Sequence, residues 1–489
     1  MKQEKNSIKT NFLMNVLLTL STFIFPLITF PYVSRVLTPI GTGKVAMATS
    51  FVQYFVMFAQ LGLPTYGIRA VAKVRDDREK LTKTVHELLI ISTITSIIAY
   101  VILFICIPTI PRISAEKPLY YIMSANIFLN CIGMEWMYKG LEQYTYITVR
   151  SIIFKFIALV LMFVFIHNQS DYLIYGVTSV VASSLSYVLN FINAKKYIDM
   201  KWLGNYDIRP HLKAVAIFLA MAIATTVYTH LDTVMLGFMT TDVDIGYYNA
   251  AVKIKTVLVS MVTALGAVLL PRASYYVETK QMVNFRIIAA KALDFVFVAA
   301  IPVTVFFIYF ARQGIMLLSG DAYMGAIQPM QLLMPTTIFI GITNILGIQI
   351  LVPLGKERAV LHSEILGAVV DLVLNFILIP RFAASGAAIG TLVAEFCVLI
   401  YQAVVLRQEV KPMLKKISYS KILFAATISL AATFWIPALG LRNFFTLAIA
   451  GIIYFGLYLG YLILRKEPIA LEALDFVLKK LKVRREEPA

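Results

Sequence analysis

Residues 12–37 read FLMNVLLTLSTFIFPLITFPYVSRVL. No charged residue lies between Lys9 and Arg35, and about 20 apolar residues are enough for a helix to cross the hydrocarbon core of a bilayer. The run is too long for a secretory signal and lacks a small-residue cleavage site, so it is predicted to be the first membrane helix. Pro26 and Pro31 each remove a backbone hydrogen bond, which predicts a bend that is either a static kink or a hinge.

Thirteen more windows of this kind follow along the chain. With the first, they lie at 12–34, 45–63, 85–107, 119–138, 147–167, 172–192, 214–236, 247–270, 287–310, 329–352, 360–380, 386–406, 420–438 and 444–464. Only 15% of the 489 residues are charged, against about a quarter in soluble domains. Fourteen crossings of about 21 residues take roughly 294 positions, so little length is left for a soluble domain. A β-barrel would instead alternate in segments of about ten residues. The sequence therefore predicts an all-α polytopic membrane protein with about 14 transmembrane helices.

The distribution of Lys and Arg predicts the orientation of these helices. With the N-terminus placed inside, 34 of the 44 basic residues fall on the inner side, 7 on the outer side and 3 within spans. Short basic connections are retained in the cytoplasm, so both termini are predicted to be cytoplasmic. The net charge of +17 thus encodes topology, and no nucleic acid is expected as a partner.

An internal repeat appears when the chain is compared with itself at an offset of 213, which aligns 136–166 with 349–379. The shared residues are Leu141, Ile152, Leu159, Val160, Leu161, Phe163 and Ile166, which align with Leu354, Ile365, Leu372, Val373, Leu374, Phe376 and Ile379. An offset of 203 places Gly43 on Gly246. We therefore expect an N-terminal lobe at 12–200 (spans 1–6) and a C-terminal lobe at 211–408 (spans 7–12), as in alternating-access transporters.

Two further segments follow the lobes. Spans 13 and 14 are predicted to form a hairpin at 418–465, followed by a basic amphipathic helix at 467–485 in which Leu and Val alternate with Lys and Arg at helical spacing. Such a helix is expected to lie on the anionic inner leaflet.

Enzyme motifs are missing from the sequence. It contains no phosphate-binding G-x-x-x-x-G-K-[ST] and no G-x-S-x-G, and His86-Glu87 lacks the second histidine of a zinc protease. Asp242-Val243-Asp244 resembles the D-x-D of glycosyltransferases, but the topology places it outside, where a solvated turn explains it better. The three cysteines lie in apolar runs and behave as small hydrophobes. The chain is predicted not to be an enzyme and to need no cofactor or metal.

Charged residues inside apolar windows are the most informative candidates, because an ionised group in hydrocarbon usually faces a cavity or a partner. The cations are Arg35, Lys155, Lys253 and Lys255, and the acids include Glu135, Asp232, Asp294, Asp371 and Glu395. Lys253 and Lys255 lie about 200° apart on a helix, so one of them is expected to snorkel to the headgroups. Cations from both lobes favour an anionic cargo.

Several segments resemble the Wzx-type (RfbX-like) polysaccharide-transport flippases of the multidrug/oligosaccharidyl-lipid/polysaccharide superfamily. They are 31–37 (PYVSRVL), 61–69 (LGLPTYGIR), 135–142 (EWMYKGLE), 235–237 (MLG), 246–254 (GYYNAAVKI), 271–274 (PRAS), 374–380 and 386–391 (GAAIGT). Relatives more often carry Asp at the position of Glu135, which keeps the charge. After the Leu at position 37, relatives tend to have Gly, whereas this chain has Thr38-Pro39, so the first outer turn is expected to differ in shape.

The resemblance implies a flippase of the bacterial cytoplasmic membrane that moves undecaprenyl-diphosphate-linked oligosaccharides from the inner to the outer leaflet. Polysaccharide polymerase and glycosyltransferases are then candidate partners. We expect the diphosphate or acidic sugars to contact Arg35, Arg69, Lys155, Lys253 and Arg272. Glu135 and Asp232 would pair with these cations or bind a coupling cation.

Three alternatives stay open at this point. A peptidoglycan-precursor flippase and a multidrug exporter belong to the same superfamily. A polysaccharide polymerase is also polytopic, but it would be expected to present a long outer loop, whereas the outer connections here have about fifteen residues or fewer. The polymerase is therefore the least favoured alternative.

Overall fold

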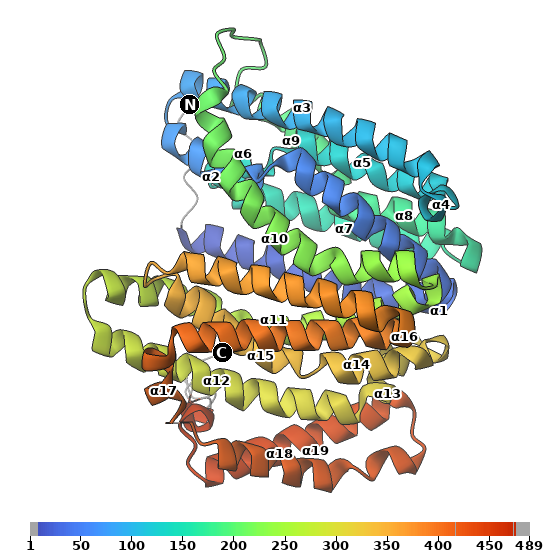
Figure 1. Cartoon of the computed structure of the whole chain (residues 1–489), viewed down its shortest axis with the longest axis vertical. Coiled ribbons are helices and arrows are strands. Elements are labelled where there is room, and N and C mark those ends of the chain that lie inside the picture. The colour runs from blue at the N-terminus through green and yellow to red at the C-terminus, as the bar shows by residue number, and fades with distance from the viewer. Residues whose placement is uncertain (1–7, 416, 473, 476–489) are drawn as a thin grey trace, which may run out of the picture. The chain divides into compact units, whose positions relative to one another are not determined.

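The computed structural model describes residues 8–415, 417–472 and 474–475, and within these ranges all regular structure is helical (Figure 1). The helices are α1 (Ile8–Gln60), α2 (Leu63–Val74), α3 (Arg78–Thr109), α4 (Pro111–Ser114), α5 (Lys117–Gly133), α6 (Glu135–Gly140), α7 (Tyr144–Phe165), α8 (Tyr172–Val180), α9 (Tyr187–Ala194) and α10 (Arg209–Met239). They continue with α11 (Asp242–Glu278), α12 (Met282–Tyr309), α13 (Ala311–Ser319), α14 (Ile327–Leu333), α15 (Thr336–Thr343), α16 (Glu357–Val405), α17 (Arg407–Leu414), α18 (Tyr419–Thr433) and α19 (Asn443–Leu464). Two π-helical turns, Val181–Leu185 and Asn344–Leu351, interrupt this series.

The helices confirm the predicted all-α polytopic membrane protein. Within the described ranges, eight helical segments are long and apolar enough to cross a bilayer, or ten if each of two bent pairs counts as one span. Two of the eight, Leu13–Val74 and Glu357–Val405, far exceed the length of one crossing, and each contains a non-helical residue. The number of fourteen spans and the cytoplasmic termini stay predictions.

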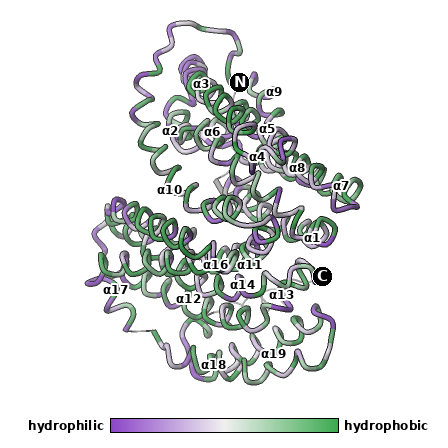
Figure 2. Tube along the Cα trace, turned by 45° about the vertical axis from the view of Figure 1, so that its right-hand side comes forward, coloured by the Kyte–Doolittle hydropathy of each residue, from purple (hydrophilic) through white to green (hydrophobic). Residues whose placement is uncertain are grey.

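The outer faces of these helices are apolar. On α7, Ile153, Phe156, Val160 and Phe163 recur at helical spacing and are exposed. A soluble protein rarely leaves such a stripe open, whereas lipid tails cover it at no cost. Figure 2 shows hydrophobic residues along α18 and α19, and hydrophilic residues around α17.

The chain forms two compact units, residues 1–249 and 250–489. In the first unit, α1 packs against α3, α5, α7 and α10. In the second, α12 packs against α15, α17 and α18, and α19 packs against α18. The predicted lobes 12–200 and 211–408 and the hairpin 418–465 remain predictions, and most of the predicted basic helix 467–485 falls outside the described residues.

The turn that was predicted to be the first outer one is a break inside α1. Thr38 has φ 57° and ψ −179°, after which the helix resumes at Pro39. A proline disfavours helical geometry in the residue before it and is well suited to a first helical position. The side-chain amide of Gln169 donates a hydrogen bond of 2.9 Å to Thr38 Oγ1. Pro26 and Pro31 lie within the helical part of α1, so this chain turns at Pro39 and not at either of them.

The repeat seen in the sequence has a counterpart in the backbone. Glu142 and Gly355 lie 213 positions apart, and both have left-handed backbone angles, with φ 59° and 72°. The next residue in each case lies directly before a long helix: Gln143 precedes α7, and Lys356 precedes α16. The aligned segments 136–166 and 349–379 therefore share a turn and a helix start as well as side chains.

Two glycines that the repeat also aligns lie against each other in the first unit. A Cβ on Gly43 would come within 1.9 Å of the Asp242 carbonyl oxygen, and one on Gly246 within 2.3 Å of the Pro39 carbonyl oxygen. Real side chains cannot approach backbone this closely. The second half of α1 and the first turn of α11 therefore depend on both glycines for their close approach.

We predict that Gly43→Ala and Gly246→Ala each lower the thermal stability of the purified protein. The added methyl group has no space, and overpacking of this kind costs about 1–3 kcal/mol. Gly456→Ala on α19 is the matched control, because a Cβ there meets nothing within 4 Å and alanine favours helix. Melting temperatures in detergent should fall for the first two variants and not for the third; equal values for all three would contradict the packing role.

Candidate functional site

A partly buried charge cluster lies where α5 ends and α6 begins. Met134 has left-handed backbone angles, which end α5 and let α6 start at Glu135. Glu135 accepts from Lys139 Nζ at 2.8 Å and lies 3.4 Å from Arg150 of α7. Only 3% of the Arg150 side chain is exposed, so its charge is compensated mainly by Glu135.

Arg150 is also held by Ser186 and Tyr187, which follow the π-helical turn Val181–Leu185. Its guanidinium donates to the Ser186 carbonyl at 3.3 Å and lies 5.1 Å from the ring centre of Tyr187. Its Nε has no hydrogen-bond partner among the described residues. Arg150 therefore joins α6, α7 and α9 through one ion pair, one carbonyl and one aromatic face.

A small pocket of about 150 Å³ opens beside this cluster. It is lined by Gln60, Pro64, Asn130, Gly133, Glu135, Trp136, Lys139 and Tyr187. Gln60 donates to the Asn130 side chain at 3.0 Å. Amides, a carboxylate, an ammonium group and aromatic rings are groups that bind hydroxyls and water. In the described part of the chain no three His, Cys, Asp or Glu residues are placed to hold a metal ion.

The predicted substrate residues of the first unit lie at separate places. Lys155, five residues beyond Arg150, is half-buried and donates to Ser21 of α1 at 2.7 Å. Arg35 is exposed and donates to the Pro31 carbonyl of its own helix. Arg69 of α2 is exposed, and its guanidinium carbon lies 5.9 Å from the ring centre of Phe218.

The remaining predicted residues lie further along the chain. Asp232 of α10 is buried and accepts a hydrogen bond from the Tyr248 hydroxyl. Lys253 of α11 is half-buried and Arg272 is exposed, and both belong to the second unit. The structure thus pairs Glu135 with Lys139 and Arg150, neither of which is among the five predicted substrate residues.

Sequence reasoning missed most of the cluster around Glu135. Arg150 lies in the predicted fifth span together with Lys155, and a cation in an apolar window was the signal that could have found it. Gln60, Asn130 and Tyr187 carry no such signal, since uncharged polar residues are common in membrane helices. Their grouping depends on how α1, α5 and α9 pack.

The incomplete zinc-protease motif has a structural role instead. His86 Nδ1 lies 2.8 Å from the Tyr206 hydroxyl, and Glu87 lies 2.9 Å from His211 Nε2. Glu87 also accepts from the backbone N–H of Asp207 at 3.0 Å. His86 and Glu87 of α3 therefore fix the connection that leads into α10.

The chain is similar to several known transport proteins. A protein of Escherichia coli (strain K12) named "Putative O-antigen transporter" is 23% identical over 405 residues, which cover 82% of this chain and 96% of that protein. The structure described as "Lipid II flippase MurJ, inward closed conformation" matches with a TM-score of 0.73 at 14% identity, over 93% of this chain and 100% of that one. An inward-facing multidrug resistance MATE family transporter of the MOP superfamily matches with a TM-score of 0.61 at 14% identity, over 82% and 99%.

The two solved structures establish a shared fold with these transporters. The family described as "Polysaccharide biosynthesis protein" matches residues 8–277. This region covers more than half of the 489 residues and includes the cluster around Glu135. The chain belongs to the polysaccharide biosynthesis protein family.

Proposed function

We propose that this protein is a flippase that moves undecaprenyl-diphosphate-linked oligosaccharide units from the inner to the outer leaflet of a bacterial cytoplasmic membrane, for capsule or O-antigen synthesis. The observation that carries the proposal is the family match over 8–277 in a chain whose fold is that of the flippase and MATE structures. The similarity to an O-antigen transporter over 82% of the chain supports this cargo. The chain is proposed to act without enzymatic activity of its own.

The physical task explains why charges are kept inside the membrane. A sugar headgroup with a diphosphate would lose its water partners in hydrocarbon, which costs several kcal/mol for each group left unpaired. Polar and cationic side chains can replace that water while the polyprenyl tail stays in lipid. In this proposal the lobes 12–200 and 211–408 open in turn to either side of the membrane.

Within this proposal, the site residues take distinct roles. Arg35, Arg69, Lys155, Lys253 and Arg272 are proposed to contact the diphosphate or acidic sugars. Asp232 and Glu135 are proposed to supply counter-charge or to bind a coupling cation. The contacts of Glu135 with Lys139 and Arg150 support the counter-charge role for that residue.

Two other cargoes belong to proteins of the same fold. The lipid II flippase and the MATE transporter match at 14% identity, so they inform the fold and not the substrate. A peptidoglycan-precursor flippase would act on lipid II, and a multidrug exporter would change drug susceptibility when deleted. Neither outcome is expected here.

The proposal is tested with the purified chain in vesicles that contain a fluorescent polyprenyl-diphosphate oligosaccharide. Protein-containing vesicles should make label on the inner leaflet accessible to an impermeant quencher, and protein-free vesicles should not. A polymerase would lengthen the glycan without changing its leaflet. Leaflet exchange of lipid II but not of the oligosaccharide would contradict the proposed cargo.

We predict that Arg35→Gln and Lys253→Gln abolish export of the polysaccharide while the protein stays in the membrane. Each change removes a proposed phosphate contact that water cannot replace inside the bilayer. Lys201→Gln, on an exposed connection, is the control and should export normally. The measurements are surface polysaccharide and membrane protein levels; wild-type export by both test variants would refute the assignment.

We predict that Glu135→Gln lowers the free energy of unfolding by about 3 kcal/mol, because it leaves the buried Arg150 without a carboxylate. Glu142→Gln breaks the Arg75–Glu142 pair, which joins atoms 2.6 Å apart but is half-exposed, and should cost less than about 1 kcal/mol. Unfolding in detergent compares the two variants. Equal losses of unfolding free energy in the two variants would mean that the Glu135–Arg150 pair stabilises the protein no more than the exposed Arg75–Glu142 pair does.

We predict that an interior-negative membrane potential speeds outward movement of the diphosphate. The potential favours export of one full negative charge by up to about 2.3 kcal/mol per 100 mV. Right-side-out vesicles with a valinomycin-set potassium gradient provide the potential, and leaflet exchange gives the rate. A rate that does not change with the gradient would show that the net charge moved is close to zero.

A further inference from the structure

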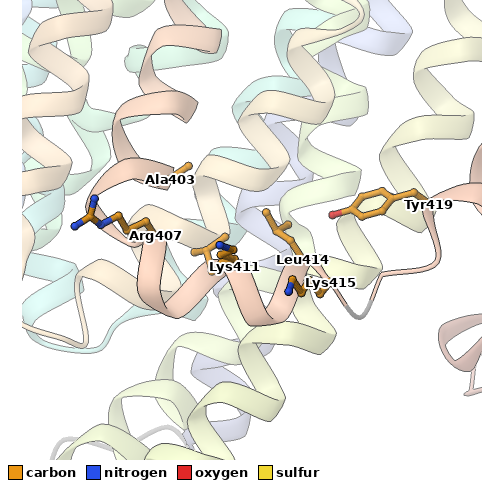
Figure 3. A pocket seen from close by; sticks show the side chains of 7 residues that line it. Ala403, Arg407, Lys411, Leu414, Lys415 and Tyr419 are labelled. Atoms are coloured by element: carbon orange, nitrogen blue, oxygen red, sulfur yellow. The ribbon is translucent and has the colours of Figure 1, made fainter.

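Helix α17 lies at the membrane surface, because it joins two candidate membrane spans. It covers Arg407–Leu414 and connects α16, which ends at Val405, to α18, which begins at Tyr419. An open groove of about 440 Å³ runs along it. The groove is lined by Ala403, Arg407, Val410, Lys411, Leu414, Lys415 and Tyr419 (Figure 3).

Three cations of this groove stand on successive turns. Arg407, Lys411 and Lys415 are spaced by four residues, and all three are exposed. No carboxylate of the described residues lies within 4 Å of any of them. Like charges at this spacing repel one another, so the stripe is unfavourable unless an anion lies over it.

Glu409, the acidic residue of α17, forms an ion pair with a residue outside the groove. Glu409 pairs with Arg286 of α12 at 3.1 Å and so does not neutralise the stripe. Val410 and Met413 are buried in the core of the second unit. These contacts hold α17 in place on α12, with its cationic side directed outward.

Apolar groups lie beside the cations in the groove. Ala403, Leu414 and the ring of Tyr419 form part of its lining, and Figure 3 shows Tyr419 directed back toward Leu414. A row of cations next to an apolar surface, at headgroup depth, matches a molecule with a phosphate at one end and an acyl chain at the other. Topology alone would require cations in this connection but would not place them on one face.

We propose that the α17 groove, defined by the seven residues above, binds the phosphate of an anionic phospholipid from the surrounding leaflet, with Arg407, Lys411 and Lys415 as its ligands. The predicted topology places this leaflet on the cytoplasmic side. The site concerns the lipid around the protein and does not depend on the proposed cargo. Lipid bound there would cover the like charges and fix the connection between α16 and α18.

The test measures lipid retained by the full-length chain in detergent, by native mass spectrometry. Phosphatidylglycerol, phosphatidylcholine with the same acyl chains, inorganic phosphate and farnesyl diphosphate are added in separate experiments. The wild-type chain should retain phosphatidylglycerol in preference to the other three. The triple variant Arg407→Gln, Lys411→Gln, Lys415→Gln should bind phosphatidylglycerol about a hundredfold more weakly, at about fivefold for each charge removed.

The matched control removes the same charge elsewhere. Lys195, Lys196 and Lys201 are exposed on the connection before α10, and their triple change to Gln should leave phosphatidylglycerol binding unchanged. If the α17 triple variant does not fold, the double variant Lys411→Gln, Lys415→Gln should still show a loss of about 25-fold.

Three results would overturn the proposal. Equal loss in the α17 and control variants would mean that only total charge matters. Retention of phosphatidylcholine equal to that of phosphatidylglycerol would mean that the groove does not distinguish the two headgroups. Displacement of phosphatidylglycerol by farnesyl diphosphate at equal concentration would mean that the groove serves a diphosphate-linked lipid instead.

Discussion

The constraint that shapes this protein is the absence of water in the bilayer interior. A backbone N–H or C=O that leaves a helix there must find a partner within the protein. The break at Met134 falls inside the predicted span 119–138, and the side-chain amide of Asn190 donates to the carbonyl of Gly133 just before it. The backbone carbonyl of Asn190 in turn accepts a hydrogen bond from the Tyr138 hydroxyl at 2.6 Å. Side chains thus join the break at Met134 to α9, the helix that follows the π-helical turn Val181–Leu185.

The same constraint applies to charge. Because the break at Met134 starts a new helix, Glu135 occupies a first helical turn, where a carboxylate is favoured by the helix dipole. It is then placed to compensate both Lys139 and Arg150. A buried arginine without a carboxylate would be costly, so the backbone break and the ion pair stabilise one another. The position of Glu135 is therefore a consequence of the fold.

Sequence patterns predicted the parts of the structure that follow from local physics. Uncharged runs predicted membrane helices. The structure has a break with φ 57° at Thr38, and the expected difference from the turn of relatives stays a prediction. Only the charged members of the cluster around Glu135 could be predicted from the sequence, because Gln60 and Tyr187 join it through the packing of segments that are distant in sequence. Exposure could not be read from the sequence either: Arg35 and Lys155 look alike as cations in apolar windows, yet one is exposed and the other bonds to Ser21.

At two aligned positions of the repeat, only the first unit carries a charged residue. At an offset of 213, Arg150 aligns with Ser363 and Glu135 with Ile348. In the second unit, Ser363 accepts from the Gln402 amide at 3.0 Å, so a neutral hydrogen bond stands where the first unit has a buried cation. A neutral pair is sufficient to hold helices together in lipid, because it costs far less to bury than an ion pair. The turn and helix start of the repeat therefore form in the second unit without an ion pair at these two positions, so the repeat does not by itself require Glu135 and Arg150.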